Sequence, residues 1–198
     1  MIIMLNKWGF LCTKQDMTEL FIDGEKIPVT LLKFLNQEII RLKTIEKDWY
    51  NAIVVGASKT EKNWNVEYKY VKEFKVEDIG NYKVGDKITM DMLSGISVVT
   101  LKGKTKGKGF QWVVKRFGFA GGPATHGSKF HKHPWGIGNR KPRRVNKNHP
   151  LPGHMGSKNV TLKNVSVVGI HNIDWENVVV VKGSVPGSRN SLLKVYLQ

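Results

Sequence analysis

The stretch VTLKNVSVVGIHNIDWENVVVVKGSVPGSRNSLLKVYL, residues 160–197, contains three short runs of mostly apolar and β-branched residues. These runs are VTLKNVSVVGI (160–170), NVVVVKGSVPG (177–187) and LLKVYL (192–197). Turn residues occur at Asn172–Asp174 and at Pro186-Gly187. Short runs of this composition, separated by turn signals, are typical of β-strands. The stretch therefore predicts three consecutive strands.

The same pattern recurs in the N-terminal half of the chain. In ELFIDGEKIPVTLLKFL (19–35), an Asp23-Gly24 turn precedes alternating apolar residues, which predicts a hairpin. NAIVVGA (51–57), WNVEYKYV (64–71) and ISVVTLKG (96–103) predict further strands, and none of these windows has the period of a long amphipathic helix. Short strands on both sides of one long loop predict a mainly β protein, built as a small barrel from which the loop projects.

The long loop has a different character. KGKTKGKG (102–109) alternates lysine with glycine, and the apolar residues of 110–117 recur at the spacing of one short helix. Residues 118–157 show no periodicity. A structureless loop of this length is expected only where it is functional or ordered by a partner. We therefore divide the chain into a β-barrel body (1–101 and 160–198) and a basic extension (102–159).

The positive charge is concentrated in one block of the chain. Residues 1–91 hold 14 Lys and Arg against 14 Asp and Glu, whereas residues 92–173 hold 15 Lys and Arg and no acid. Such a block can be a solvated face or a disordered tail, but this one is internal and contains Phe and Trp residues. Cations, aromatic rings and glycines in one segment suit nucleic acid, since they meet phosphates, stack on bases and allow close approach.

Other classes of protein fit the sequence poorly. Cys12 is the single cysteine, so no disulfide framework exists; together with the lack of a long apolar run or a signal peptide, this leads us to expect a soluble intracellular protein. The His-rich basic block contains no carboxylate that could complete a catalytic triad, and no P-loop or dinucleotide motif occurs. The block lacks the amphipathic pattern and lipidation signals of a membrane-surface module.

The histidines of the basic block could suggest a metal site, but zinc usually needs Cys or carboxylate ligands as well. The block holds His126, His131, His133, His149 and His154, with no acid and no cysteine nearby. We therefore expect no metal, no other cofactor and no small-molecule substrate, and interpret these histidines as hydrogen-bonding partners of phosphate or 2′-OH groups.

Four blocks of the sequence resemble the family of the large-subunit ribosomal protein L-three, of bacterial or organellar type. They are MTELFIDGEKIPVT (17–30), KGKTKGKGFQWVVKRFGFAGGPATHGSKFHKHPWGIG (102–138), PLPGHMGSKNVTLKN (150–164) and VVVVKGSVPGSRNSLLKV (178–195). The blocks follow the family order through most of the chain. One departure is GNRKP (138–142), where Arg140 and Lys141 replace the amide residues common at the tip of the extension.

The resemblance implies a closed Greek-key β-barrel like those of translation factors, with an inserted α+β portion at residues 36–90 and a long irregular extension. It implies a non-enzymatic, structural constituent of the large ribosomal subunit that binds 23S-type rRNA, contacts neighbouring ribosomal proteins and helps to nucleate assembly. The extension would reach toward the peptidyl transferase centre. The ribosome would be cytoplasmic, bacterial rather than organellar. The alternative is a non-ribosomal RNA-binding β-barrel module.

The expected RNA-binding residues are lysines, arginines, histidines, Trp135 and Asn139. Lysines of the Lys–Gly run would lie along phosphates, and arginines near the tip would bind phosphate bidentately and stack on bases. Trp135 would either stack on a base or fill the packing of its own loop. The full set is Lys102, Lys104, Lys106, Lys108, Lys115, Arg116, His126, Lys129, His131, Lys132, His133, Trp135, Asn139, Arg140, Lys141, Arg143, Arg144, Lys147, His154 and Lys158.

Overall fold

A computed structural model describes residues 8–22, 24–62, 65–90, 95–138, 141, 143–173 and 176–197. The chain folds into two compact units. We call residues 1–104 with 159–198 the body, and residues 105–158 the extension. The prediction of a mainly β fold with little helix is confirmed.

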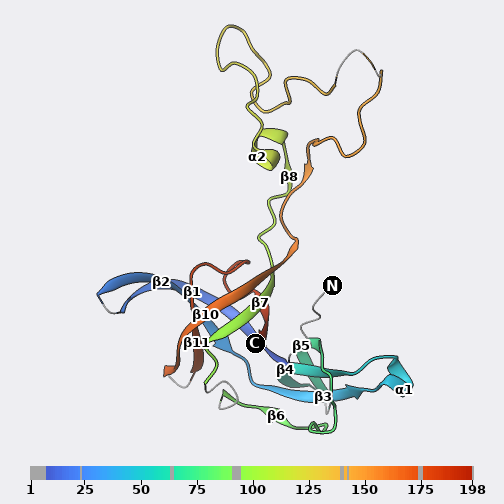
Figure 1. The fold of residues 1–198 in the computed structure, drawn as a ribbon, viewed down its shortest axis with the longest axis vertical. Helices are drawn as coiled ribbons and strands as arrows, with labels where there is room; N and C mark the ends of the chain where they lie inside the picture. Colours follow the sequence, from blue (N-terminus) through green and yellow to red (C-terminus); the bar gives the residue numbers. More distant parts are fainter. Residues whose placement is uncertain are drawn as a thin grey trace. The chain divides into compact units, whose positions relative to one another are not determined.

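Six antiparallel strands of the body close into a barrel in the order β1-β12-β7-β10-β11-β2 (Figure 1). Their bounds are β1 Gly9–Ile22, β2 Glu25–Phe34, β7 Val98–Lys104, β10 Asn159–Ile173, β11 Glu176–Lys182 and β12 Leu192–Leu197. The long strand β10 pairs with β7 over its first part and with β11 over its second part. Irregular register in both ladders lets the single strand β10 bend between its two partners.

The barrel explains why β11 carries four consecutive valines. Successive side chains of a strand point to opposite faces. Val179 and Val181 lie in the main core, whereas Val178 and Val180 pack with Val29 in a second, smaller apolar cluster on the other face. Both faces of β11 are therefore buried, which removes the usual alternation of apolar and polar residues.

The remaining strands of the body form a second sheet in the order β5-β4-β3-β6. Their bounds are β3 Gln37–Lys43, β4 Ala52–Lys62, β5 Asn65–Lys75 and β6 Lys87–Ile88. The expected α+β character of this portion is wrong for the described residues, since its one α-helix is the single turn α1, Ile45–Asp48. Tyr68 and Tyr70 share one face of β5, as their spacing predicts, while Trp64 lies outside the described residues.

A buried glutamine at the start of β3 joins the two sheets. The backbone N–H of Leu11 in β1 donates to Gln37 Oε1 at 2.8 Å, and Gln37 Nε2 donates to the Leu11 carbonyl at 3.2 Å. Gln37 is only 5% exposed, so water cannot replace these bonds. Since a buried backbone group without a partner is costly, the side chain of Gln37 fixes the junction of barrel and sheet.

The variant Gln37→Met, of similar length but without polar atoms, is expected to lower the free energy of unfolding by about 1–3 kcal/mol. The reason is that the buried Leu11 N–H loses its partner, whereas the Leu11 carbonyl still accepts the Leu35 N–H at 3.4 Å. Urea denaturation measures the change. The matched control is Gln15→Met at a half-buried position of β1, and an equal loss in both variants would contradict the bridging role.

Candidate nucleic-acid interface

The extension begins as two antiparallel segments that run in from the body strands β7 and β10. The Thr105 N–H donates to the Lys158 carbonyl at 2.9 Å, and the Lys108 N–H donates to the Met155 carbonyl at 2.9 Å. Further along, β8 (Phe110–Gln111) pairs with β9 (Gly153–His154). Lys106, Lys108 and Lys158 are exposed on this neck, so three cations lie on a hydrogen-bonded ribbon.

A glycine makes the neck possible at its closest point. Gly156 has φ +78°, and a Cβ there would overlap the carbonyl oxygen of Lys106. A side chain at residue 156 would therefore be strained and would also push the two segments apart. Thr105 closes the other end of the neck, since its hydroxyl accepts the Lys158 N–H at 3.1 Å.

A short helix, α2 (Val113–Phe117), follows the neck and ends at Gly118 in the left-handed conformation, with φ 76°. This corrects the expected helix over residues 110–117, because Phe110 and Gln111 pair with β9 instead of joining the helix. Val113 is fully buried, whereas Lys115 and Phe117 are exposed. The short helix therefore has one buried and one exposed side.

Arg116 has contacts within the extension itself. Its Nη1 donates to the Leu151 carbonyl, and its guanidinium lies 4.8 Å from the centre of the Phe117 ring. The side chain is only half-exposed. Arg116 therefore ties α2 to the returning segment of the extension, and its expected contact with RNA stays a prediction.

Aromatic rings gather beside this helix. The ring centroids of Trp112 and His133 are 4.0 Å apart, and those of His133 and Phe130 are 5.7 Å apart. Phe110 packs edge-on against Trp112 at 5.9 Å. His133 thus packs through its ring while its side chain remains exposed, and its expected hydrogen bonds to RNA stay a prediction. Phe110 and Phe130 nevertheless remain 65% and 51% exposed, which leaves apolar surface for a partner.

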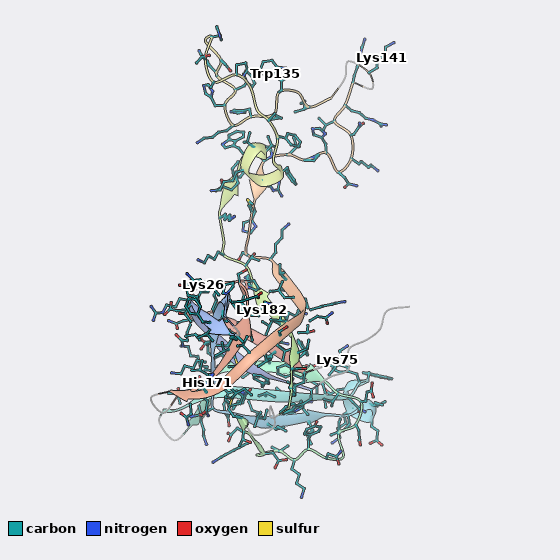
Figure 2. The ribbon with its side chains drawn as sticks, turned by 60° about the vertical axis from the view of Figure 1, so that its left-hand side comes forward. Lys26, Lys75, Trp135, Lys141, His171 and Lys182 are labelled. Carbon is teal, nitrogen blue, oxygen red and sulfur yellow. The ribbon has the colours of Figure 1, made fainter. Side chains whose placement is uncertain are left out.

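Trp135 bears on the two interpretations of its role. One edge of the indole lies against Gly122, where a Cβ would come within 2.9 Å of Cζ3. The side chain is 72% exposed, however, so most of the ring surface faces solvent. Figure 2 shows Trp135 and Lys141 on the loops of the extension. Packing against Gly122 thus positions the ring and leaves most of its surface exposed. This exposure favours the interpretation that Trp135 stacks on a partner.

The predicted cations of the extension are largely free to meet a partner. Exposed side chains are found at Lys106, Lys108, Lys115, Lys129, Lys132, Lys141, Arg143, Arg144, Lys147 and Lys158. His126, His131 and His154 are exposed as well. The extension contains no Asp or Glu; no carboxylate of its own can therefore neutralise these groups. Asn139 and Arg140 lie outside the described residues.

Two of the predicted residues, Lys102 and Lys104, belong to the body. The β7 ladder continues to Lys104, which pairs with Asn159 of β10. Regular hydrogen bonding through residue 104 corrects the expected start of the flexible Lys–Gly run at residue 102. Both lysines are exposed, but a rigid strand holds their backbone.

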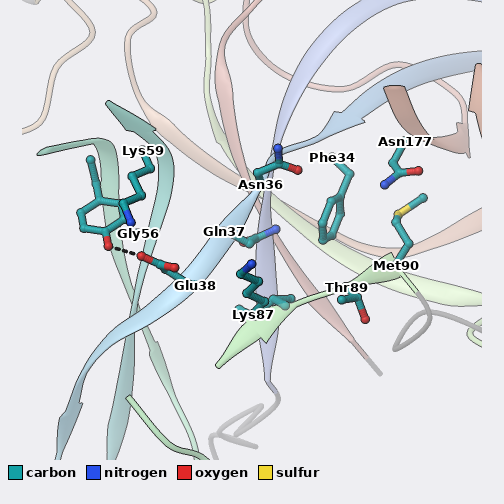
Figure 3. A pocket seen from close by; sticks show the side chains of 12 residues that line it. Phe34, Asn36, Gln37, Glu38, Gly56, Lys59, Lys87, Thr89, Met90 and Asn177 are labelled. Atoms are coloured by element: carbon teal, nitrogen blue, oxygen red, sulfur yellow. Dashed lines mark hydrogen bonds between the residues drawn. The ribbon is translucent and has the colours of Figure 1, made fainter. Parts of the chain in front are cut away.

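Within the described residues, no three His, Cys, Asp or Glu side chains converge to hold a metal ion. In the same part of the chain, no helix is long and apolar enough to cross a membrane. The body contains a cavity of about 580 Å³ between β2 and the second sheet (Figure 3). Its charged side chains, Glu38, Lys59 and Lys87, are of both signs, and Tyr68 donates to the Glu38 carboxylate. This cavity is therefore unlike the uniformly cationic extension.

The amino-acid sequence is similar to those of known proteins over both the body and the extension. Residues 89–177, which include the whole extension, match the family model of ribosomal protein L3. The chain is 38% identical to the large ribosomal subunit protein uL3 of Geobacter metallireducens over 202 residues, covering 94% of this chain and 95% of the relative. The chain belongs to the ribosomal protein L3 family.

Other members of the ribosomal protein L3 family show similar identity. The uL3 protein of Oceanobacillus iheyensis is 39% identical over 201 residues, which cover 94% of this chain and 95% of the relative. That of Bdellovibrio bacteriovorus is 42% identical over 203 residues, covering 94% and 91% respectively. The likeness therefore extends over both the body and the extension.

Sequence reasoning missed two kinds of residue at this interface. Phe110, Trp112 and Phe130 were not among the expected RNA-binding residues, although their rings lie in the cluster that contains the expected residue His133. Lys72 and Lys194 of the body lie beside Lys102 in a groove, although they are far from it in sequence. Only the aromatic content of the basic block could have indicated the first group, and nothing in the pattern indicates the second.

Protection of backbone amides from hydrogen exchange is expected to differ between the barrel and the extension of the RNA-free protein. Barrel amides lie in ladders, whereas in the described part of 119–150 few backbone bonds occur, among them Gly122 N–H to the Phe130 carbonyl at 2.9 Å. Amide hydrogen exchange without RNA should therefore be slow in the barrel and fast over the described residues 131–138 and 143–148. Protection of that loop comparable to β7 would show that the extension is ordered without a partner.

Proposed function

We propose that the chain is a structural constituent of the large ribosomal subunit that binds 23S-type rRNA through its extension. The observation that carries this proposal is the extension's charge: residues 105–158 hold twelve Lys and Arg and no acid. Twelve like charges repel one another, and bound polyanion converts that repulsion into attraction. Membership of the ribosomal protein L3 family supports ribosomal RNA as this polyanion.

The parts of the extension have different roles in this proposal. Lys106, Lys108 and Lys158 on the neck lie along phosphates. Trp135 stacks on an unpaired base, since aromatic stacking on a base contributes about 1–3 kcal/mol. The exposed Arg143 and Arg144 bind phosphate bidentately, which suits a crowded RNA interior. His126, His131 and His154 donate hydrogen bonds to phosphate or 2′-OH groups.

The finer family properties are part of the same proposal. The extension reaches toward the peptidyl transferase centre, where it supports RNA structure without catalysing peptide transfer. The body contacts neighbouring large-subunit proteins and helps to nucleate assembly. The order of the barrel strands, in which β12 lies between β1 and β7, supports a Greek-key arrangement like that of translation factors.

Competition binding tests the proposal. The full chain is expected to prefer large-subunit rRNA over an unrelated RNA of equal length by at least about tenfold at physiological salt, because shape and unpaired bases add to charge attraction. Filter binding with labelled rRNA and unlabelled competitor measures this ratio. Equal competition by both RNAs would leave only a basic RNA-binding β-barrel module and would overturn the ribosomal role.

A further inference from the structure

A second cationic surface lies on the body, separate from the residues of the extension. A groove of about 520 Å³ is lined by four lysines, Lys72, Lys102, Lys104 and Lys194, together with the polar residues Asn159 and Ser191. The lysines come from three strands, β5, β7 and β12. Pairing of β7 with β12 brings Lys102, Lys104 and Lys194 together, while Lys72 comes from β5 of the second sheet.

The arrangement of these lysines opposes stability. Lys102 and Lys194 are directly opposite each other in the β7–β12 ladder. Like charges at directly opposed positions of an antiparallel pair are destabilising. β7 and β12 contain no Asp or Glu, so neither strand supplies a compensating carboxylate. A ligand of opposite charge would remove this repulsion.

Lys194 is held in place at the edge of the groove. Its Nζ donates to the backbone carbonyl of Glu73 at 2.9 Å and lies 5.3 Å from the centre of the Phe74 ring. Burial, then the charges of Lys102 and Lys72, lower the pKa of Lys194, while the Glu73 carboxylate acts in the opposite direction. That carboxylate already accepts a hydrogen bond from Lys43 at 2.7 Å. The cationic character of the groove therefore persists beside this acid.

We propose that the groove formed by Lys72, Lys102, Lys104 and Lys194 binds phosphate groups of the rRNA backbone, as a contact of the body additional to those of the extension. The inference rests on the proposed function, which supplies the polyanion. Each lysine ammonium group is a compact point charge on a flexible side chain, which suits contact with a backbone phosphate. Such contacts position the protein on the RNA and do not depend on the base sequence. Regular strands fix the backbone of all four lysines, so the site exists before RNA binds.

A double variant tests the groove in the full chain. Lys72→Gln with Lys102→Gln removes two exposed cations and leaves the half-buried Lys194 in place. The slope of log K against log salt for large-subunit rRNA is expected to become shallower by about 1.4–1.8, since each lost phosphate contact contributes roughly 0.7–0.9. The control pair Lys47→Gln with Lys83→Gln removes the same charge at exposed sites outside the groove, and its slope should remain close to wild type.

Chemical footprinting locates the contact directly. Acetylation of lysines, read by mass spectrometry, is expected to slow at least about fivefold at Lys72 and Lys102 when rRNA is bound, because contacted amines are covered. Lys47 and Lys83 should react equally with and without RNA. Wild-type slopes in the double variant together with unprotected Lys72 and Lys102 would overturn the groove proposal. Protection appearing only in assembled subunits would do the same and would favour an acidic protein partner.

The two proposals fail in different ways. If the wild-type chain has no preference for rRNA over unrelated RNA, the proposed function fails. If the preference is present and is weakened by substitutions in the extension but not in the groove, the proposed function stands and the groove inference alone is wrong.

Discussion

The affinity of the chain for large-subunit rRNA is expected to fall by roughly 10³–10⁵-fold between about 50 and 200 mM monovalent salt, the range for six to ten phosphate contacts on duplex DNA. The extension supplies enough cations for this number, since ten of its Lys and Arg side chains are exposed in the described residues. Each contact releases condensed counterions, and added salt opposes that release. The loss should therefore be linear on logarithmic axes.

Fluorescence or filter binding across a salt series measures this slope. The measurement needs unrelated RNA of equal length as a control, because charge attraction alone gives both RNAs a steep slope. Plotted as log K against log salt, the two RNAs should give nearly parallel lines. The line for rRNA should lie higher by a constant amount, which is the specific part of the affinity. A slope corresponding to one or two contacts would show that most of the extension's cations remain in solvent, and the interface would have to be much smaller than the structure allows.

Much of the fold could be predicted because its signals are local. The strands β10, β11 and β12 contain the valine-rich and leucine-rich runs, although β10 continues through Asn172 to Ile173, where the pattern predicts a turn, and β11 ends at Lys182. In β12 the buried residues Leu193 and Val195 follow the period of two, whereas both faces of β11 are buried. The helix over 110–117 failed for a non-local reason. Its apolar spacing is helical, but the backbone of Phe110 and Gln111 pairs with β9, which lies far along the chain.

The composition of the interface could be predicted, but its internal contacts could not. Residues 92–173 contain 15 Lys and Arg and no Asp or Glu, and this composition by itself indicates a polyanion as the partner. In contrast, Arg116 looks identical in sequence to the exposed arginines near residue 143, and only the carbonyl of Leu151 in the folded extension distinguishes it. The lysines of the groove illustrate the same limit, because the β7–β12 ladder alone places Lys194 opposite Lys102.

The triple variant Lys141→Ala, Arg143→Ala and Arg144→Ala is expected to weaken rRNA binding by about 10²–10³-fold near 0.1 M salt and to lower the salt slope by about 2–3. Each lost contact removes roughly 0.7–0.9 from the slope, and at 0.1 M salt it costs a similar number of decades in affinity. All three side chains are exposed in the extension, so their loss leaves no cavity and no buried group unpaired. The free energy of unfolding of the body should therefore change by less than about 0.5 kcal/mol.

Binding and urea denaturation of the same variant separate the possible outcomes. A control with Lys47→Ala, Lys83→Ala and Lys87→Ala removes the same charge from the body at exposed positions, and its binding should decrease far less. If the tip variant bound as tightly as wild type, the tip would lie free of RNA, and the neck lysines with the body groove would have to supply the affinity. If its body unfolded at markedly lower urea, the stability of the two units would be coupled. If the protein is a stable barrel whose extension is ordered by RNA, the variant should bind rRNA weakly while the stability of its body remains unchanged.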